Sequence, residues 1–185
     1  MEKKYQIIYA DPPWQYGSKY YQDSGRDFKN IHDHYQTMTI EEIKNLDIKN
    51  ITNRDCACFL WVTDSHLKEG IEILECWGFK YKTVAFNWIK KTPKGETYVN
   101  FAPWTLKSSE ICLLGIKGNM GQYKKSRNVR QLVEAIRTAH SQKPEEVRKR
   151  IEELFGNINR LELFAREKTA NWDIWGNEIE SGIKL

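Results

Sequence analysis

A carboxylate and two prolines follow an apolar run near the start of the chain. Residues 5–10 are apolar, β-branched or aromatic apart from one glutamine, and Asp11, Pro12, Pro13 and Trp14 come directly after them. Because neither proline can donate to a sheet ladder, a strand over this run must end at residue 10 or 11. We therefore expect a rigid polar corner at the carboxyl end of a buried strand, where open α/β sheets bind their ligands.

This corner is predicted to hold a flat group that carries two N–H hydrogens. Asp11 accepts hydrogen bonds, and so do the carbonyls beside Pro12 and Pro13, where the prolines have no N–H to compete. The exocyclic amine of adenine is such a group, and Trp14 could supply a face on which the base stacks. With both hydrogens held, the nitrogen can aim its lone pair at an electrophile. An internal ion pair of Asp11, together with filled space beside the Trp14 indole, would contradict this hypothesis.

The Asp-Pro-Pro-Trp corner resembles the catalytic motif of the MT-A (70-kDa subunit) family of S-adenosylmethionine-dependent adenine-N6 methyltransferases. One tetrapeptide is modest support, but further matches follow in family order over nearly the whole chain. They are Tyr35–Met38, Phe59–Thr63, Asn87–Lys90, Glu110–Asn119, Lys143–Pro144, Glu162–Arg166 and Trp175–Glu178.

The resemblance implies an α/β protein with the Rossmann-like class I methyltransferase fold. It implies a mostly parallel sheet with helices on both faces, in one methyltransferase domain over residues 1–185. The order of the motifs is permuted, because the catalytic corner precedes the strand at 161–165 that faces the cofactor. No glycine-rich loop follows Ala165, so the cofactor is expected to be recognised by side chains.

The resemblance also assigns roles to individual residues. The catalytic residues are Asp11, Pro12, Pro13 and Trp14. The cofactor, S-adenosylmethionine, is expected to contact Asp11, Lys143, Arg166, Asn171, Asn177 and Glu178. The substrate side is expected to involve Tyr35, Trp61, Lys90, Trp104 and Glu110, although a core position is equally open for Trp61. No metal site is expected.

The implied reaction is methyl transfer from S-adenosylmethionine to adenine N6 in nucleic acid. DNA is favoured over RNA because the chain is compact. The alternatives are an RNA adenine-N6 methyltransferase and a non-catalytic nucleic-acid-binding subunit. Cytosine-N4 methylation is a nearer rival, but its motif usually begins with serine rather than aspartate. A homodimer, or a heterodimer with a related subunit, is compatible with the sequence.

Hydrophobic spacing and capping signals predict the elements that position these residues. Helices are expected from a capping box at Thr39, from 63–65 to Gly78 with Leu67, Ile71 and Leu74 on one side, and over 144–155. Strands are expected at 56–62, 81–89, 110–116 and 161–165. Residues 129–136 have helical spacing, but the family has a strand near 132–137, and we follow the resemblance there.

Composition sets the remaining expectations. The 185 residues carry 29 Lys and Arg against 25 Asp and Glu, a net charge of +4 that permits nucleic acid as a partner without requiring it. The start of the chain resembles no signal peptide, and no apolar run is long enough to span a membrane, so a cytoplasmic protein without membrane contact is expected. The cysteines are expected to be reduced core residues. They are Cys56, Cys58, Cys76 and Cys112.

Two segments stand apart from the predicted elements. Residues 15–34 are polar and aromatic with no clear period, which predicts a mobile lid next to the corner or, alternatively, an insertion with little function. Residues 117–130 contain five cations and no acidic residue, which predicts a phosphate-binding surface. An ordinary solvated loop explains that charge nearly as well.

Overall fold

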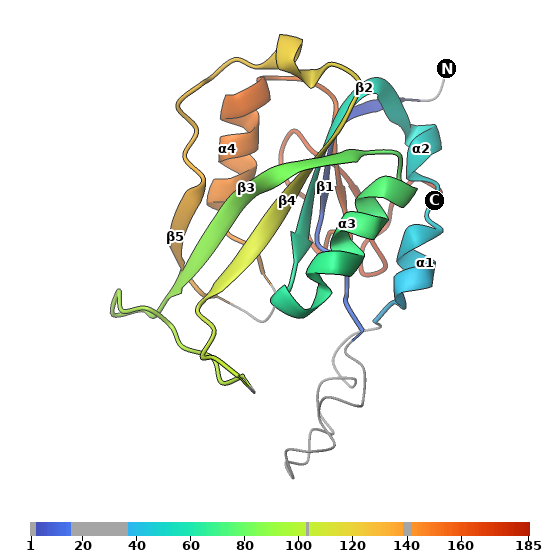
Figure 1. The fold of residues 1–185 in the computed structure, drawn as a ribbon. Helices are drawn as coiled ribbons and strands as arrows, with labels where there is room; N and C mark the ends of the chain where they lie inside the picture. The colour runs from blue at the N-terminus through green and yellow to red at the C-terminus, as the bar shows by residue number, and fades with distance from the viewer. Residues whose placement is uncertain (1–2, 16–36, 103, 139–141) are drawn as a thin grey trace.

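A computed structural model describes residues 3–15, 37–102, 104–138 and 142–185. The described residues form one seven-stranded sheet in the order β5-β3-β4-β2-β1-β6-β7 (Figure 1). The strands are β1 (Tyr5–Ala10), β2 (Thr52–Val62), β3 (Lys80–Lys91), β4 (Ser109–Lys117), β5 (Leu132–Ile136), β6 (Arg160–Leu163) and β7 (Asp173–Trp175).

The sheet is mixed, which qualifies the expectation of a mostly parallel one. β1 is parallel to β2 and β6, β3 is parallel to β5, and β6 is parallel to β7. β4 is antiparallel to both of its neighbours, β2 and β3. Six strands therefore end at the same edge of the sheet, which we name the carboxyl edge, and β4 begins there. The opposite edge is named the amino edge.

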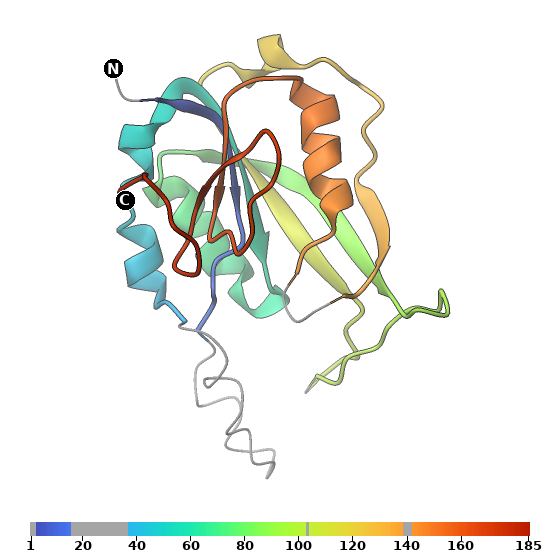
Figure 2. The same cartoon turned by 180° about the vertical axis from the view of Figure 1, so that it is seen from behind.

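Helices cover both faces of the sheet, as expected. α1 (Ile40–Lys44), α2 (Ile48–Ile51) and α3 (Leu67–Cys76) lie on one face, and α4 (Glu145–Phe155) lies on the other (Figures 1 and 2). Each face has its own cluster of buried apolar side chains, with α1 and α3 in one cluster and α4 in the other. Two short 3-10 helices, η3 (Asp64–His66) and η4 (Met120–Tyr123), complete the helical elements of the described residues.

Local signals account for the ends of several helices. The predicted capping box begins α1, because the Thr39 side chain accepts from the Glu42 N–H and Glu42 accepts from the Thr39 N–H. Gly78 follows α3 with φ +86° and Gly156 ends α4 with φ +72°, conformations that favour glycine. β5 confirms the strand that the resemblance predicted, against the helical spacing of that segment.

The side of α3 that packs on the sheet is only partly the apolar side that the sequence indicated. Leu67 is 40% exposed, because α3 turns Gly70, Ile73 and Leu74 toward the sheet instead. At Gly70 an added Cβ would lie 2.3 Å from the Val62 Cγ1 atom, so the helix makes its closest approach there.

The cysteine prediction holds for three of the four residues. Cys56, Cys58 and Cys112 are buried free thiols within central strands. Cys76 is exposed, because it is the last residue of α3 and lies on the side of the helix that faces solvent. None of the helices that the structure describes is both long and apolar enough to cross a membrane. The predicted lid, except Gln15, and the predicted substrate residue Tyr35 lie outside the described residues.

Candidate active site

The polar corner lies at the carboxyl edge, as its sequence predicts. Ile7, Ile8, Tyr9 and Ala10 of β1 are each at most 1% exposed, so the strand is buried on both faces. Ala10 pairs with the ends of β2 and β6, and Asp11 therefore leaves the sheet between these two strands.

Four charged side chains form a chain of ion pairs at this corner. The Lys143 Nζ atom lies 2.7 Å from Asp11 Oδ2 and 3.3 Å from Glu110 Oε2. Lys90 Nζ donates to the other oxygen of Glu110. Asp11 follows β1, Glu110 is the second residue of β4, Lys90 is the last but one of β3 and Lys143 precedes α4, so four segments of the chain meet here. The structure thus brings together one predicted catalytic residue, one cofactor residue and two substrate residues.

The environment of these groups changes their pKa values. Burial raises the pKa of Asp11, and the nearby Lys143 ammonium only partly opposes this rise. Burial alone would lower the pKa of Lys143, but the carboxylates of Asp11 and Glu110 raise it overall. Burial would raise the pKa of Glu110, but its two lysine partners lower it overall. Lys143 and Glu110 are therefore held charged, whereas Asp11 binds a proton more readily than an exposed aspartate.

The prediction that no N–H competes for the proline carbonyls is wrong. The Trp14 N–H donates to the Pro12 carbonyl and the Met38 N–H donates to the Pro13 carbonyl, each over 2.9 Å. The Trp14 bond closes a tight turn within the corner, and the Met38 bond fixes the corner onto the segment that leads into α1. A carbonyl oxygen has two lone pairs, so the Pro12 oxygen retains one acceptor position.

The prediction that Trp14 offers a free stacking face is also wrong. Trp14 is only 6% exposed, and its ring stacks on His66 with a centroid distance of 5.0 Å and an interplanar angle of 22°. Asp11 is in an ion pair as well, through Oδ2, so both conditions set against the original hypothesis are met. The corner therefore does not hold a base between Asp11 and Trp14 as predicted, and what is left of the hypothesis is the second carboxylate oxygen of Asp11 at the carboxyl edge. The indole therefore supports the corner from the α3 side, and it is not the surface on which a base stacks in this conformation.

Trp61 is a core residue rather than a direct substrate contact. It is 1% exposed, and its Nε1–H donates to the Tyr9 hydroxyl over 2.8 Å. The Lys143 ammonium lies 5.5 Å from the Trp61 ring centroid, which is cation–π distance. Trp61 thus positions Lys143 from beneath.

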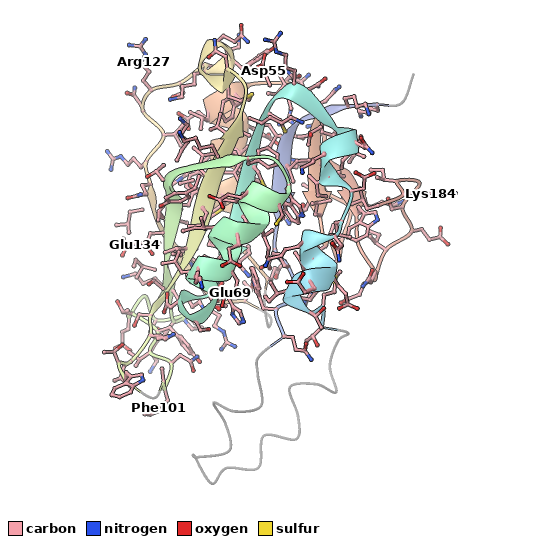
Figure 3. All side chains as sticks on the ribbon, turned by 45° about the vertical axis from the view of Figure 1, so that its right-hand side comes forward. Asp55, Glu69, Phe101, Arg127, Glu134 and Lys184 are labelled. Atoms are coloured by element: carbon pink, nitrogen blue, oxygen red, sulfur yellow. The ribbon has the colours of Figure 1, made fainter. Side chains whose placement is uncertain are left out.

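An exposed aromatic hairpin between β3 and β4 borders the same edge. Trp104 is 90% exposed and Phe101 is 82% exposed. Figure 3 shows Phe101 at the far end of this hairpin. Lys107 of this hairpin forms an ion pair with Asp64 of η3 over 3.1 Å, which ties the hairpin to the end of β2. Trp104 thus belongs to a hairpin at the carboxyl edge and is available to solvent.

Three of the six predicted cofactor residues follow the ends of β6 and β7. Arg166 Nε is 3.7 Å from Glu178 Oε1, and Asn177 is exposed beside Glu178. At Gly176 an added Cβ would lie 2.3 Å from the Ala165 carbonyl oxygen, so the two segments approach closely there. Asn171 is different. It precedes β7, whose first residue pairs with Leu161 near the start of β6, and it therefore lies toward the amino edge.

A cavity of about 510 Å³ adjoins Lys143 on the α4 side of the corner. Its lining combines the start of α4 with the segment after β6 and the end of β5. The charged residues in this lining are Lys143, Glu145, Glu146, Arg148, Glu167 and Lys168.

The Arg148 and Glu162 pair beside this cavity was not predicted as part of the site. Arg148 donates to both oxygens of Glu162, over 2.8 and 2.6 Å. A carboxylate between Leu161 and Leu163 in a short apolar strand is the sequence signal for a buried cationic partner. The position of that partner, on a helix, could not be read from the sequence.

Comparison with known proteins agrees with this geometry. The model of the MT-A70 family matches residues 5–178. The chain is 39% identical to the type II methyltransferase M.MunI of Mycoplasma sp., over 96% of this chain and 78% of that protein. It is 30% identical to the human N(6)-adenosine-methyltransferase catalytic subunit METTL3, over 98% of this chain but 29% of that protein. An Arabidopsis thaliana N(6)-adenosine-methyltransferase, MT-A70-like, is 31% identical over 97% of this chain and 24% of its own length.

The family match covers every strand of the sheet and the whole corner around Asp11. The chain belongs to the MT-A70 family of methyltransferases.

Proposed function

We propose that this chain transfers a methyl group from S-adenosylmethionine to the N6 amine of adenine in nucleic acid. The observation that carries the proposal is the position of Asp11, at the carboxyl edge and 2.7 Å from Lys143, in a chain that the family model matches over residues 5–178. Residues 1–185 are proposed to be one methyltransferase domain with the Rossmann-like class I fold, modified by the antiparallel strand β4.

The side chains at the carboxyl edge fit S-adenosylmethionine. The Lys143 ammonium suits a carboxylate, the Asp11 carboxylate suits an ammonium, and Glu178 can accept from ribose hydroxyls. The adjoining cavity of about 510 Å³ is within the usual size range of small-molecule sites. We place Asp11, Lys143, Arg166, Asn177 and Glu178 in the cofactor set and leave Asn171 out, because Asn171 lies toward the other edge. S-adenosylmethionine supplies an electrophilic methyl group on its sulfonium.

Asp11 and the Pro12 carbonyl are proposed to orient the target amine. Asp11 Oδ2 is occupied by Lys143, which leaves Oδ1 to accept one N–H, while the second lone pair of the Pro12 carbonyl accepts the other. Acceptors fixed in this way would stabilise the positive charge that develops on the nitrogen as the N–C bond forms and the S–C bond of the sulfonium breaks, which releases a neutral thioether. The amine proton then leaves to Asp11 or to solvent.

The ion pair of Asp11 has a role in this proposal. Lys143 contacts Glu110 as well, and Glu110 is also paired with Lys90. Lys143 can therefore turn toward a ligand carboxylate and still keep one protein carboxylate within reach. Lys90 and Lys143 both lie beside Glu110 and keep its carboxylate ionised. Lys143 can therefore hold its position without leaving a buried charge unpaired.

DNA is proposed as the polymer. The supporting observation is the match to a type II methyltransferase over 78% of that protein, compared with 29% for the human N(6)-adenosine relative. RNA is the second candidate, on the identity to that relative. The exposed Trp104 is proposed to stack on a nucleotide near the target. The proposal is compatible with a homodimer and with a heterodimer that includes a related subunit.

The test is methyl transfer from labelled S-adenosylmethionine to single-stranded DNA, duplex DNA and RNA, followed by analysis of the released nucleosides. Label in N6-methyldeoxyadenosine supports the proposal, and label in N6-methyladenosine supports RNA instead. Label in N4-methylcytosine would overturn the base assignment. Nucleic-acid binding without transfer of label to any polymer would favour a non-catalytic subunit.

A further inference from the structure

The basic loop at residues 117–130 lies away from the candidate active site. β4 begins beside Glu110 at the carboxyl edge and ends at Lys117 on the amino edge, where it pairs with the early part of β2. A rise of about 3.4 Å for each residue puts these two positions about 24 Å apart. Figure 3 shows Arg127 at the opposite end of the molecule from Phe101 on the aromatic hairpin. Phosphates next to a base at the corner are therefore out of reach of the outer part of the loop.

This loop carries the basic excess of the chain. Its five cations meet no acidic residue within the segment, while the net charge of all 185 residues is +4. All the other residues together therefore sum to −1. The cations are Lys117, Lys124, Lys125, Arg127 and Arg130, and all except Lys117 are exposed.

Two carboxylates that contact the loop accept from neutral donors. Asp55 accepts from the Asn119 N–H and from the side chain of Gln122. Glu153 accepts from the Ser126 hydroxyl over 2.8 Å. Within the part of the chain that the structure describes, none of the four exposed cations of the loop forms a salt bridge.

The backbone of the loop is fixed from beneath. The Lys125 N–H donates to the Leu154 carbonyl over 2.8 Å at the end of α4, and the Arg150 guanidinium donates to the Arg130 carbonyl over 2.7 Å. The stem of Lys125 also packs against Gly156, where an added Cβ would lie 3.2 Å from Lys125 Cγ. The backbone that carries the four exposed cations is therefore fixed, so less conformational entropy is lost when these side chains bind a ligand.

We propose that this loop binds the phosphate backbone of a nucleic-acid segment remote from the target adenine. The inference rests on the proposed function, since it assumes a polymer substrate. A polyanion fits better than a protein partner, because protein interfaces have an apolar centre and the large exposed apolar side chains of the described residues all lie outside 117–130. Clustered Lys and Arg on one surface are the electrostatic footprint of backbone binding.

The test compares two variants that each lose two positive charges. The first is Lys124→Gln with Arg127→Gln, two exposed side chains in the loop. The matched control is Lys49→Gln with Lys184→Gln, two exposed lysines outside it. Binding to a duplex of about 40 base pairs and to a hairpin duplex of about 12 base pairs is measured by fluorescence anisotropy over a salt series, without S-adenosylmethionine.

On the long duplex, the loop variant should lose about two from the slope of log K against log salt concentration, and its affinity should fall about tenfold or more. The control should keep the wild-type slope, and both variants should methylate the short duplex within about twofold of the wild-type rate. The salt slope is a binding measurement made without S-adenosylmethionine, so an Asp11→Ala protein that keeps the wild-type slope separates this inference from the proposed chemistry. An unchanged slope in the loop variant would overturn the inference, and so would an equal loss on the short duplex.

Discussion

Lys143 Nζ lies 2.7 Å from Asp11 Oδ2 although the two residues are 132 positions apart in the chain. The side chain of Lys143 is 7% exposed and that of Asp11 is 23% exposed. An ion pair with this little exposure is costly to break on one side only, because the remaining charge stays buried. The pair therefore links the catalytic corner to the start of α4 and makes the position of each residue depend on the other.

Lys143→Met should lower the free energy of unfolding by about 3 kcal/mol, because it leaves Asp11 and Glu110 as neighbouring carboxylates without their shared cation. Urea denaturation measures this loss. Lys149→Met is the control, since Lys149 is 65% exposed in its pair with Glu145 and should cost less than about 0.5 kcal/mol. Equal losses in the two variants would show that Lys143 carries no special share of the stability.

Methyl transfer should rise with pH through a pKa above 3.8, the ordinary value for aspartate, because burial raises the pKa of Asp11 and the reaction uses its carboxylate. Since Lys143 opposes that rise, Lys143→Met should move the acid limb to higher pH. The measurement is the pH profile of single-turnover rates at saturating substrates. A raised carboxyl pKa also means that the contribution of Asp11 to stability falls as the pH rises from 3.8 through its folded value. If the acid limb of methyl transfer lay at the same pH in the wild type and in Lys143→Met, the assignment of that limb to Asp11 would be contradicted.

Trp14→Ala should mainly reduce stability, whereas Trp104→Ala should mainly weaken the binding of nucleic acid. Trp14 is 6% exposed, so its removal should cost about 3 to 5 kcal/mol of stability. Trp104 is 90% exposed, so its removal should change stability by less than about 0.5 kcal/mol and raise KM for nucleic acid about tenfold. Thermal unfolding and steady-state kinetics distinguish the two. A stable Trp14→Ala protein with a raised KM would restore the stacking role to Trp14.

Gly176→Ala should destabilise the segment that joins the ends of β6 and β7. The added Cβ would meet the Ala165 carbonyl oxygen at 2.3 Å and the Ala165 nitrogen at 2.9 Å, which are backbone atoms and cannot turn away. We expect a loss of about 2 kcal/mol and weaker binding of S-adenosylmethionine, measured by calorimetry. Gly182→Ala, where nothing lies within 4 Å of the added atom, should bind normally. Similar binding by both variants would exclude this segment from the cofactor site.

The elements with strong local signals could be predicted from the sequence. The capping box at Thr39 and the apolar runs of β1, β2, β4 and β6 fix their own conformations, since capping and burial depend on neighbouring residues. β5 is the exception. Its spacing is helical, and its strand conformation comes from parallel pairing with β3, which only the resemblance indicated.

The arrangement of the site could be predicted only in part. The motifs identified Asp11, Lys90, Glu110 and Lys143, but ion pairing among four segments depends on tertiary packing that periodicity does not report. The burial of Trp14 was missed for a similar reason. Its stacking partner His66 comes from η3, in a segment that the sequence presented only as a helix start.

Asp11→Ala gives the most direct test of the role of the corner. Transfer of labelled methyl to adenine should fall at least about a hundredfold, because one of the two proposed acceptors for the amine is removed. Binding of S-adenosylmethionine, measured by calorimetry on the same protein, should stay within about tenfold of wild type, since Lys143 keeps Glu110 as a partner. Loss of transfer with binding retained is the predicted result. Loss of both together, or transfer at the wild-type rate, would contradict the assignment of Asp11 to the chemical step.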